Sequence, residues 1–414
     1  MNIWMINHYA SSPGRSWSAR HVSLAAGLVK RGHSVKLFAS SFDDCLMTRR
    51  PDSPKPIEWE SFAGVDIGWL PAPEYHDNSW GRGWNTLVFA FRVLQLPRHC
   101  HPFPDLVYAS TPSLFQAMAG LILARRLRVP FVLEIRDIWP QSLIDVGMSR
   151  FHPFIWVSAL IERYLYPRAD AIIPLMPDAA PHLVAHGAAQ DRIYWIPNGV
   201  NFDVVPPLTP PVKKDVLEVL YAGGFGGGNN PRVIVETAAI LRQRGGPALR
   251  FRIIGSGPQE AEMIAKRDAL KLDNISFEPP TSRIRIYPRL SQADILLAPY
   301  SKLGVHRFGV SLNKLFDYMA VARPIVFANH ASNHPVRDAG CGVECPADDP
   351  TAIADAIQIL AGMSVEERWQ MGLRGRHYVE QNHDFAHLAV KLEAILAGAA
   401  RGTSAAVTVQ QLNS

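Results

Sequence analysis

The chain has 414 residues, 48% of them hydrophobic and 19% charged, which allows about two to three domains with large cores and excludes wholesale disorder. Its net charge of +5 suits an anionic ligand or an anionic membrane surface but is too small to indicate a nucleic-acid-binding protein. The four cysteines are scattered and form no C-x-x-C pair, which excludes a disulfide framework and favours a reducing cytoplasm.

Uninterrupted apolar runs stay short of the about 18 residues that a membrane span needs. The stretch 84–97 is broken by Arg92, and the stretch 114–124 ends before Arg125. Residues 1–6 are apolar but lack the basic start of a signal peptide, so they predict a buried strand. We therefore expect a cytoplasmic protein that either is soluble or lies on the inner face of the cell membrane.

The first half of the chain alternates short apolar runs with stretches of helical periodicity. Apolar runs predict strands at residues 2–6, 35–39, 106–109, 131–135, 171–174 and 193–196. Helical spacing predicts helices at residues 17–31, 113–127 and 154–166. This alternation predicts a parallel sheet covered on both faces, with ligands bound beyond the carboxyl ends of its strands.

A proline-rich, polar segment without periodicity follows and predicts a linker at residues 202–217, with a long surface loop in one domain as the alternative. The alternation then restarts. Strands are predicted at residues 219–222, 251–254, 275–278, 295–298 and 324–327, and helices at residues 231–244, 258–270, 312–320, 352–360, 365–381 and 385–399. The predicted fold class is α/β, with two facing Rossmann-like, doubly wound domains at residues 1–201 and 218–382. We expect helix 383–400 to cross back to the first domain, and the small, polar tail 401–414 to be disordered.

The stretch 309–320 is the strongest candidate for a binding site. Ser311 predicts a cap for the helix that follows, and Lys314 and Asp317 share one face of that helix. A lysine in the first turn opposes the helix dipole by about 0.3–1 kcal/mol, a cost that an anion bound at the helix start removes. Asp317 could accept hydrogen bonds from two sugar hydroxyls. Phosphate at the cap and a ribose one turn further predict a nucleotide-sugar site, with an ordinary capped surface helix as the alternative.

In the first half, three ionisable residues, Glu134, Arg136 and Asp137, follow the apolar strand at 131–135. Such groups are costly to bury unless they are paired or used, so they are candidates for the active site, with an internal Arg–Asp pair as the alternative. Trp139 could stack on the face of a sugar.

The first loop predicts a further anion site, in which His8, Arg15 and Arg20 bind an acceptor diphosphate; a solvated basic loop is the alternative. The segment 78–104 mixes tryptophan and phenylalanine with arginine. It suits the surface of an anionic bilayer, or else forms a helix packed into the domain.

Several motifs occur in an order that resembles a known family. They are Pro197-Asn-Gly-Val-Asn201, the glycines of 223–228, Gly255-Ser-Gly-Pro258, and residues 311–320 with Arg323-Pro324. In this order they resemble the retaining glycosyltransferases of the GT-B type, glycosyltransferase family 4, over the whole chain except the tail. Asn7-His8-Tyr9 and Leu133–Pro140 further resemble the L-fucosamine transferase-like branch, which acts in the assembly of bacterial surface polysaccharides.

The resemblance implies a donor, an acceptor and a set of site residues. The donor would be a nucleotide-sugar, UDP-linked, and the acceptor a lipid-linked saccharide; no metal is expected, because the chain carries no Asp-x-Asp motif. Catalytic residues would be Arg136, Asp137 and Lys314. Donor-binding residues would be Gly223, Gly224, Gly255, Arg283, His306, Ser311, Leu312, Asn313, Lys314 and Asp317. Acceptor-binding residues would be His8, Arg15, Arg20, Glu134 and Trp139.

The sequence departs from the family pattern at three places, one of which is Arg136, where many relatives have a histidine. Of the usual two glutamates, the second is matched by Asp317 and the first by Gly309. Where an arginine and a lysine commonly hold the donor diphosphate, this chain has Phe225 and the pair Asn229–Asn230. Two alternatives to a transferase therefore stay open, a UDP-sugar 2-epimerase of related fold and a non-catalytic assembly subunit.

Overall fold

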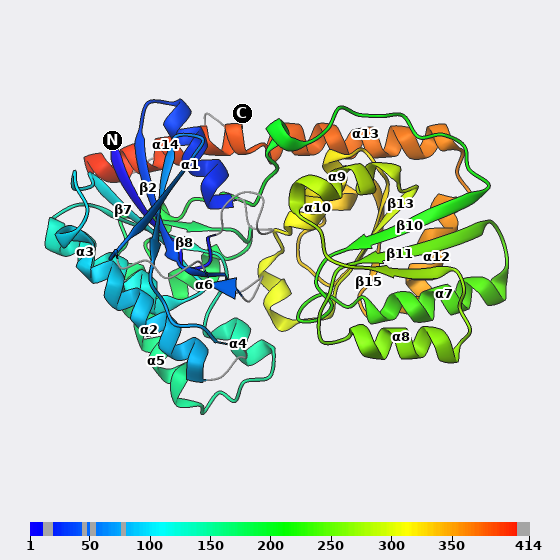
Figure 1. Cartoon of the computed structure of the whole chain (residues 1–414), viewed down its shortest axis with the longest axis horizontal. Helices are drawn as coiled ribbons and strands as arrows, with labels where there is room; N and C mark the ends of the chain where they lie inside the picture. The colour runs from blue at the N-terminus through cyan, green and yellow to red at the C-terminus, as the bar shows by residue number, and fades with distance from the viewer. Residues whose placement is uncertain (11–19, 44–47, 50–54, 76–79, 404–414) are drawn as a thin grey trace. The chain divides into compact units, whose positions relative to one another are not determined.

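The computed structural model describes residues 1–10, 20–43, 48–49, 55–75 and 80–403. The chain divides into two compact units (Figure 1). The first unit comprises Met1–Pro197 and the segment that starts at Phe385, and the second comprises Asn198–Asp384.

The first unit is built on a sheet of strand order β5-β6-β2-β1-β7-β8-β9. All its neighbouring strands are parallel except β5 and β6, which form an antiparallel hairpin. The strands are β1 (Asn2–Ile6), β2 (Ser34–Ser40), β5 (Glu58–Phe62), β6 (Val65–Leu70), β7 (Leu106–Ser110), β8 (Phe131–Ile135) and β9 (Ala171–Pro174). Two short strands, β3 (Phe42–Asp43) and β4 (Thr48–Arg49), pair separately.

Helices cover both faces of this sheet. They are α1 (Arg20–Lys30), α2 (Trp80–Gln95), α3 (Leu114–Leu127), α4 (Gln141–Asp145), α5 (Pro153–Leu165), α6 (Ala180–Ala185) and α14 (Phe385–Arg401), with the 3-10 turns η1 (Leu96–Arg98), η2 (Tyr166–Arg168) and η3 (Gln190–Arg192). Successive strand side chains point to opposite faces, so one face of β1 presents Ile3 and Met5 to α1 and α14, and the other presents Ile6 to α3. Helix α14 thus belongs to the core of the first unit although it is the last helix in the chain.

The second unit repeats the plan with a parallel sheet of order β12-β11-β10-β13-β14-β15. Its strands are β10 (Val216–Ala222), β11 (Ala248–Ile254), β12 (Ile275–Glu278), β13 (Ile295–Pro299), β14 (Ile325–Asn329) and β15 (Gly342–Pro346). Its helices are α7 (Arg232–Arg244), α8 (Glu260–Ala269), α9 (Arg283–Gln292), α10 (Asn313–Ala320), α11 (Pro335–Asp338), α12 (Pro350–Ala361) and α13 (Val365–Asn382), with η4 (Phe202–Val204) and η5 (Gly304–Phe308).

The predicted class, two α/β domains with parallel sheets, is confirmed, and two local predictions are wrong. Residues 193–196 form no strand; Ile193 makes only an isolated bridge to Ile172. Ser311 does not cap α10, because Leu312 occupies the cap position and the Ser311 hydroxyl accepts the Asn198 N–H at 2.7 Å instead. Within the described part of the chain, none of the helices has both the length and the hydropathy that a bilayer crossing requires.

Candidate active site

The start of α10 lies beside the glycine-rich loop that follows β10. The Lys314 ammonium donates to Asn229 Oδ1 at 2.7 Å and to the Tyr221 hydroxyl at 3.2 Å, and that hydroxyl donates to Gly224 O at 2.7 Å. Lys314 Nζ also lies 4.4 Å from the centre of the Tyr221 ring and 5.2 Å from that of Tyr300. Burial lowers the pKa of Lys314 to about 7. Since these partners are neutral, a bound anion would stabilise the charged lysine.

Two glycines allow this close approach of backbone and side chain. A Cβ on Gly223 would lie 2.5 Å from Lys314 Nζ, and a Cβ on Gly255 would lie 1.9 Å from Gly223 O. Their own N–H groups donate to Ile254 O and Glu278 O, each at 3.0 Å. The lack of a side chain at Gly223 and Gly255 therefore leaves space at the predicted donor site. Their N–H groups are bonded to neighbouring strands.

Unsatisfied polar groups collect at the start of α10. The cap residue Leu312 makes no side-chain hydrogen bond to the first turn. Asn313 Oδ1 and His306 Nδ1 are buried and have no hydrogen-bond partner. Burial also lowers the pKa of His306, so this ring is neutral near pH 7. Buried polar atoms are normally paired, so an ordered water or a bound ligand would satisfy these two.

Asp317 lies one turn further along α10, but it is engaged within the protein. It is 3% exposed, and its Oδ1 accepts from Arg283 Nη2 at 2.6 Å and from the Tyr287 hydroxyl at 2.7 Å. Burial alone would lower the pKa of Arg283, but the Asp317 carboxylate raises it. Arg283 Nη2 also donates to Gly199 O at 3.3 Å. The expectation that Asp317 is a free acceptor for sugar hydroxyls is therefore wrong at Oδ1, which holds a buried ion pair between α10 and α9.

The positions where the sequence departs from the family pattern have structural explanations. Phe225 is a core residue, 1% exposed, so it is not part of the polar site. Asn230 Nδ2 donates to Asp348 Oδ1 at 2.7 Å, which fixes the position of this loop. Asn229 of the same loop contacts Lys314. Gly309 has φ 81° and ψ 174°, a conformation open essentially to glycine alone. A glutamate at this position would strain the backbone.

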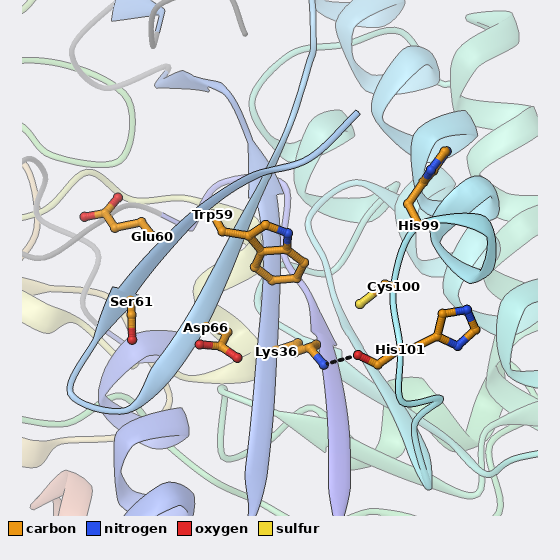
Figure 2. A pocket seen from close by; sticks show the side chains of 8 residues that line it. All are labelled: Lys36, Trp59, Glu60, Ser61, Asp66, His99, Cys100 and His101. Carbon is orange, nitrogen blue, oxygen red and sulfur yellow. Dashed lines mark hydrogen bonds between the residues drawn. The ribbon is translucent and has the colours of Figure 1, made fainter. Parts of the chain in front are cut away.

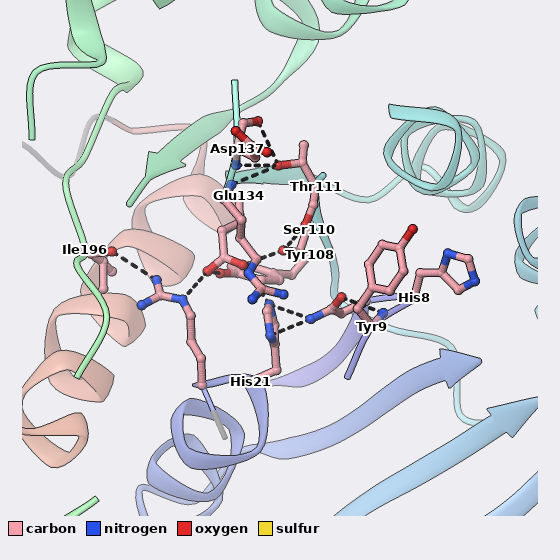
Figure 3. Close-up of polar contacts among 12 residues, drawn as sticks. His8, Tyr9, His21, Tyr108, Ser110, Thr111, Glu134, Asp137 and Ile196 are labelled. Carbon is pink, nitrogen blue, oxygen red and sulfur yellow. Dashed lines mark hydrogen bonds and ion pairs between the residues drawn. The ribbon is translucent and has the colours of Figure 1, made fainter. Parts of the chain in front are cut away.

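In the first unit, Glu134 is the centre of a fully buried polar network (Figure 3). Its Oε1 accepts from Arg20 Nε at 2.7 Å and from the Tyr108 hydroxyl at 2.6 Å, and its Oε2 accepts from His21 Nε2 at 2.7 Å and from Ser110 Oγ at 2.5 Å. Burial alone would raise the pKa of Glu134, but Arg20 and His21 hold it well below its usual range. The network therefore contains a charged carboxylate whose hydrogen bonds are made by the protein itself.

Arg20 completes this network at the end of the first unit. Its Nη2 donates to Ile196 O at 3.0 Å, and its Nη1 donates to Pro197 O. Glu134 and Arg20 were predicted to bind the acceptor, but both are buried and engaged. Their packing favours a positioning role for α1, β8 and the segment that ends at Pro197.

The residues that follow β8 are more open to a ligand. Arg136 and Asp137 are half-buried. The Arg136 N–H donates to Thr111 Oγ1 at 2.8 Å, while Arg136 Nε is buried without a hydrogen-bond partner. Burial raises the pKa of Asp137 and lowers that of Arg136. Trp139 packs edge-to-face on Phe154 of α5, with ring centres 5.8 Å apart. The alternative prediction for this group was an internal Arg–Asp pair. The buried ion pair beside it instead joins Arg20 to Glu134.

His8 is buried rather than part of a solvated loop. Its Nε2 lies 2.6 Å from Asn85 Oδ1, and its ring stacks on Phe89 with centres 4.6 Å apart. Burial lowers the pKa of His8 to about 4, so His8 would bring no positive charge to the predicted diphosphate site near pH 7. Arg15, predicted beside it, lies outside the described residues.

Two other features of the first unit contain none of the predicted residues. Glu162, His182 and His186 have ligand atoms within 4.8 Å of one another and could hold a divalent cation. A pocket of about 420 Å³ lies between the β5–β6 hairpin and the segment after η1 (Figure 2). Lys36, on its floor, donates to His101 O at 2.9 Å. Lys36 pairs with Asp66 early in β2 and β6, so the pocket is away from the carboxyl ends where such sheets bind ligands.

Family models cover both units of the chain. A model described as glycosyl transferase 4-like domain matches residues 18–199, and a model described as glycosyl transferases group 1 matches residues 217–362. The chain belongs to the glycosyltransferases of GT-B fold. The start of α10 lies within the second match, and the Glu134 network lies within the first.

Three similar proteins agree with this assignment. A protein of Escherichia coli (strain K12), named for a glycosyltransferase of colanic acid biosynthesis, is 25% identical over 235 residues, which are 55% of this chain and 56% of that protein. This alignment thus spans about half the length of the relative. A sucrose-phosphate synthase from Thermosynechococcus elongatus superimposes with a TM-score of 0.74 at 17% identity, over 96% of this glycosyltransferase and 98% of that chain. The Anabaena protein HepE in complex with UDP-glucose gives a TM-score of 0.65 at 13% identity, over 96% and 100%.

Proposed function

We propose that this glycosyltransferase moves a sugar, with retention of configuration and without a metal ion, from a UDP-sugar to a lipid-linked saccharide in the assembly of a bacterial surface polysaccharide or lipopolysaccharide. The relative named for colanic acid biosynthesis supports the pathway class, and the neighbour that contains UDP-glucose supports the donor class. The L-fucosamine transferase-like motifs make that branch the first to test.

One observation carries the donor proposal, the partly buried Lys314 ammonium beside an α10 start that no side chain caps. In the family pattern, cations after the first strand of this domain hold the diphosphate. Here Asn229 of that loop accepts from Lys314 instead. Lys314 thus brings a cation from α10 to the same place, where it neutralises the leaving group together with the first-turn N–H groups.

The reaction needs no carboxylate nucleophile. The bond between sugar C1 and the diphosphate oxygen breaks, and a bond from C1 to the acceptor hydroxyl oxygen forms on the same face of the sugar. The acceptor proton passes to the departing diphosphate oxygen. Gly309, where relatives carry a carboxylate, is compatible with this route because the phosphate itself is the base.

In the first unit, Arg136 and Asp137 are the proposed contacts with the reacting sugars. Arg136 Nε is buried without a hydrogen-bond partner and could donate to a phosphate or sugar oxygen. Asp137, whose pKa is raised by burial, could orient an acceptor hydroxyl. Trp139 is the proposed stacking surface for an acceptor sugar.

The direct test incubates the protein with labelled UDP-sugars and a bacterial lipid extract, with and without EDTA. We expect transfer of label to lipid, unchanged by EDTA and lost in Lys314→Ala. Label that appears in a new UDP-sugar without an acceptor would instead establish the 2-epimerase. Gly309 also favours one other candidate, a non-catalytic subunit, which would bind UDP-sugars without any transfer.

A further inference from the structure

Many of the exposed apolar side chains of the first unit lie on two helices, α2 and α5. On α2, Trp80, Trp84, Leu87 and Phe91 recur at helical spacing and are exposed, while Phe89 and Val93 on the other side are buried. On α5, exposed Trp156, Leu160 and Tyr164 form a similar stripe opposite buried Ser158 and Glu162. Helices with one face in a core normally place polar residues on the other, so these outer faces need an explanation.

Helix α3 joins the two stripes into one surface. Both α2 and α5 pack against α3, on one side of the sheet, while α14 covers the other side (Figure 1). The half-buried Phe115, Met118 and Ile122 lie opposite Gly120, whose Cα faces Ala109 of the sheet. Phe115 contacts Phe154 of α5 with ring centres 6.0 Å apart. We call this surface, formed by the outer sides of α2, α3 and α5, the aromatic face.

The charged side chains in the segments that form the aromatic face are almost all positive. Residues 80–101, 114–128 and 151–168 contain a single acidic side chain, Glu162, and it is buried. Exposed arginines occur in the same segments, at Arg98, Arg125, Arg126 and Arg163, with Arg150 just before α5. Trp and Phe beside arginine are the composition of a surface that lies in the headgroup region of an anionic bilayer.

We propose that the aromatic face docks this enzyme on an anionic phospholipid membrane. Tryptophan rings would lie at the headgroup level, leucine and phenylalanine would reach the acyl chains, and the arginines would pair with lipid phosphates. A second copy of the chain fits less well, because a symmetric contact would bring arginine against arginine. A lipid-linked acceptor requires this location, and to that extent the inference rests on the proposed function.

The test measures co-sedimentation of the full chain with vesicles of phosphatidylcholine alone and of phosphatidylcholine with phosphatidylglycerol. We expect binding to the anionic vesicles only, weakened by salt. The double variant Phe91→Ser/Leu160→Ser should lower the partition coefficient by about tenfold or more, since both side chains are exposed and their loss removes inserted apolar area. The matched control is Ile359→Ser, 54% exposed on α12 of the second unit, which should bind as the wild type does.

Two charge-reversal variants test the electrostatic attraction between the arginines and the anionic lipids. Arg98→Glu/Arg163→Glu should lower binding to the anionic vesicles by about tenfold, whereas Arg337→Glu on α11, also exposed, should have no effect. Thermal unfolding of each variant should match the wild type, because the replaced side chains are on the surface.

Three outcomes would overturn the inference. They are no binding to anionic vesicles, binding that the Phe91/Leu160 variant leaves unchanged, and a wild-type dimer that this variant turns into a monomer while vesicle binding persists. UDP-sugar binding, measured without vesicles, separates this inference from the proposed function. If the wild type does not bind a UDP-sugar, the proposed function is rejected. If it binds a UDP-sugar but does not bind vesicles, only the docking role of the aromatic face is rejected.

Discussion

At the residue scale, the chain places a single lysine where diphosphate recognition is expected to require positive charge. The environment of Lys314 is aromatic and amide-like, so its charge is only marginally stable before a ligand arrives. Arg283, in contrast, has a permanent carboxylate partner in Asp317. Arg283 therefore serves the fold, whereas Lys314 is the cation that we propose for an anionic ligand.

The pH dependence of donor binding tests the role of Lys314. With a pKa of about 7, the free enzyme loses the Lys314 charge as the pH rises through 7, whereas the diphosphate of a UDP-sugar stays charged. We expect the affinity for a UDP-sugar to fall by about tenfold for each pH unit above about 7.5, and binding to take up a proton. Lys314→Arg is the matched control, since arginine stays charged and its affinity should be flat in the same range. Calorimetry in buffers of different ionisation enthalpy measures both quantities, and a flat wild-type profile would contradict this role.

Stability measurements test the role of Asp317. Asp317→Ala leaves the Arg283 charge buried without its partner, so we expect the free energy of unfolding to fall by about 3–5 kcal/mol. Arg283→Met/Asp317→Leu should recover much of this loss, because it removes both charges. Urea denaturation followed by circular dichroism provides the comparison. If Asp317→Ala unfolds like the wild type but binds UDP poorly, the carboxylate serves the ligand rather than the fold.

At the scale of elements, close helix packing explains why the last helix of the chain belongs to the first unit. A Cβ on Gly27 of α1 would lie 2.4 Å from the Ala389 Cβ of α14, so only glycine allows these helices their present distance. The buried leucines of both helices share one core; they are Leu24, Leu28, Leu388, Leu392 and Leu396.

Alanine substitutions test this packing. Gly27→Ala should destabilise the protein by about 1–3 kcal/mol through overpacking. The matched control is Gly83→Ala in α2, where an added Cβ would meet nothing within 4 Å and should instead stabilise the helix by up to about 1 kcal/mol. Thermal unfolding of the two variants should shift in opposite directions. Equal shifts would show that the α1–α14 contact is looser than described.

The helices and strands also show how much of the fold could be predicted from the sequence. Alternating apolar runs and helical periodicity indicated both parallel sheets, because each strand and helix carries its own pattern. The β5–β6 hairpin and α9 were missed, since β5 is mostly exposed and α9 contains Pro288. Residues 193–196 are apolar because the segment packs on β9, although it makes no ladder there. An apolar run indicates that a segment is buried. The segment forms a strand only where its backbone also pairs with that of a neighbouring strand.

At the scale of the whole molecule, local motifs were enough to place the elements of the candidate site, but not to predict which distant side chains pair. The start of α10 was identified from local sequence. The partners Tyr221 of Lys314, Tyr287 of Asp317, and His21 and Tyr108 of Glu134 were missed, because each lies on another element and looks like a core residue in the sequence. We predicted ligand contacts at Glu134, Arg20 and His8, but these side chains are buried and bind other residues of the protein.

The central claim is that a nucleotide diphosphate binds at the start of α10. A crystal structure of the protein with a UDP-sugar tests it most directly. We predict diphosphate oxygens within about 3 Å of Lys314 Nζ and of the N–H groups of the first α10 turn. A nucleotide bound elsewhere, with Lys314 still hydrogen-bonded to Asn229 and Tyr221 alone, would contradict the account.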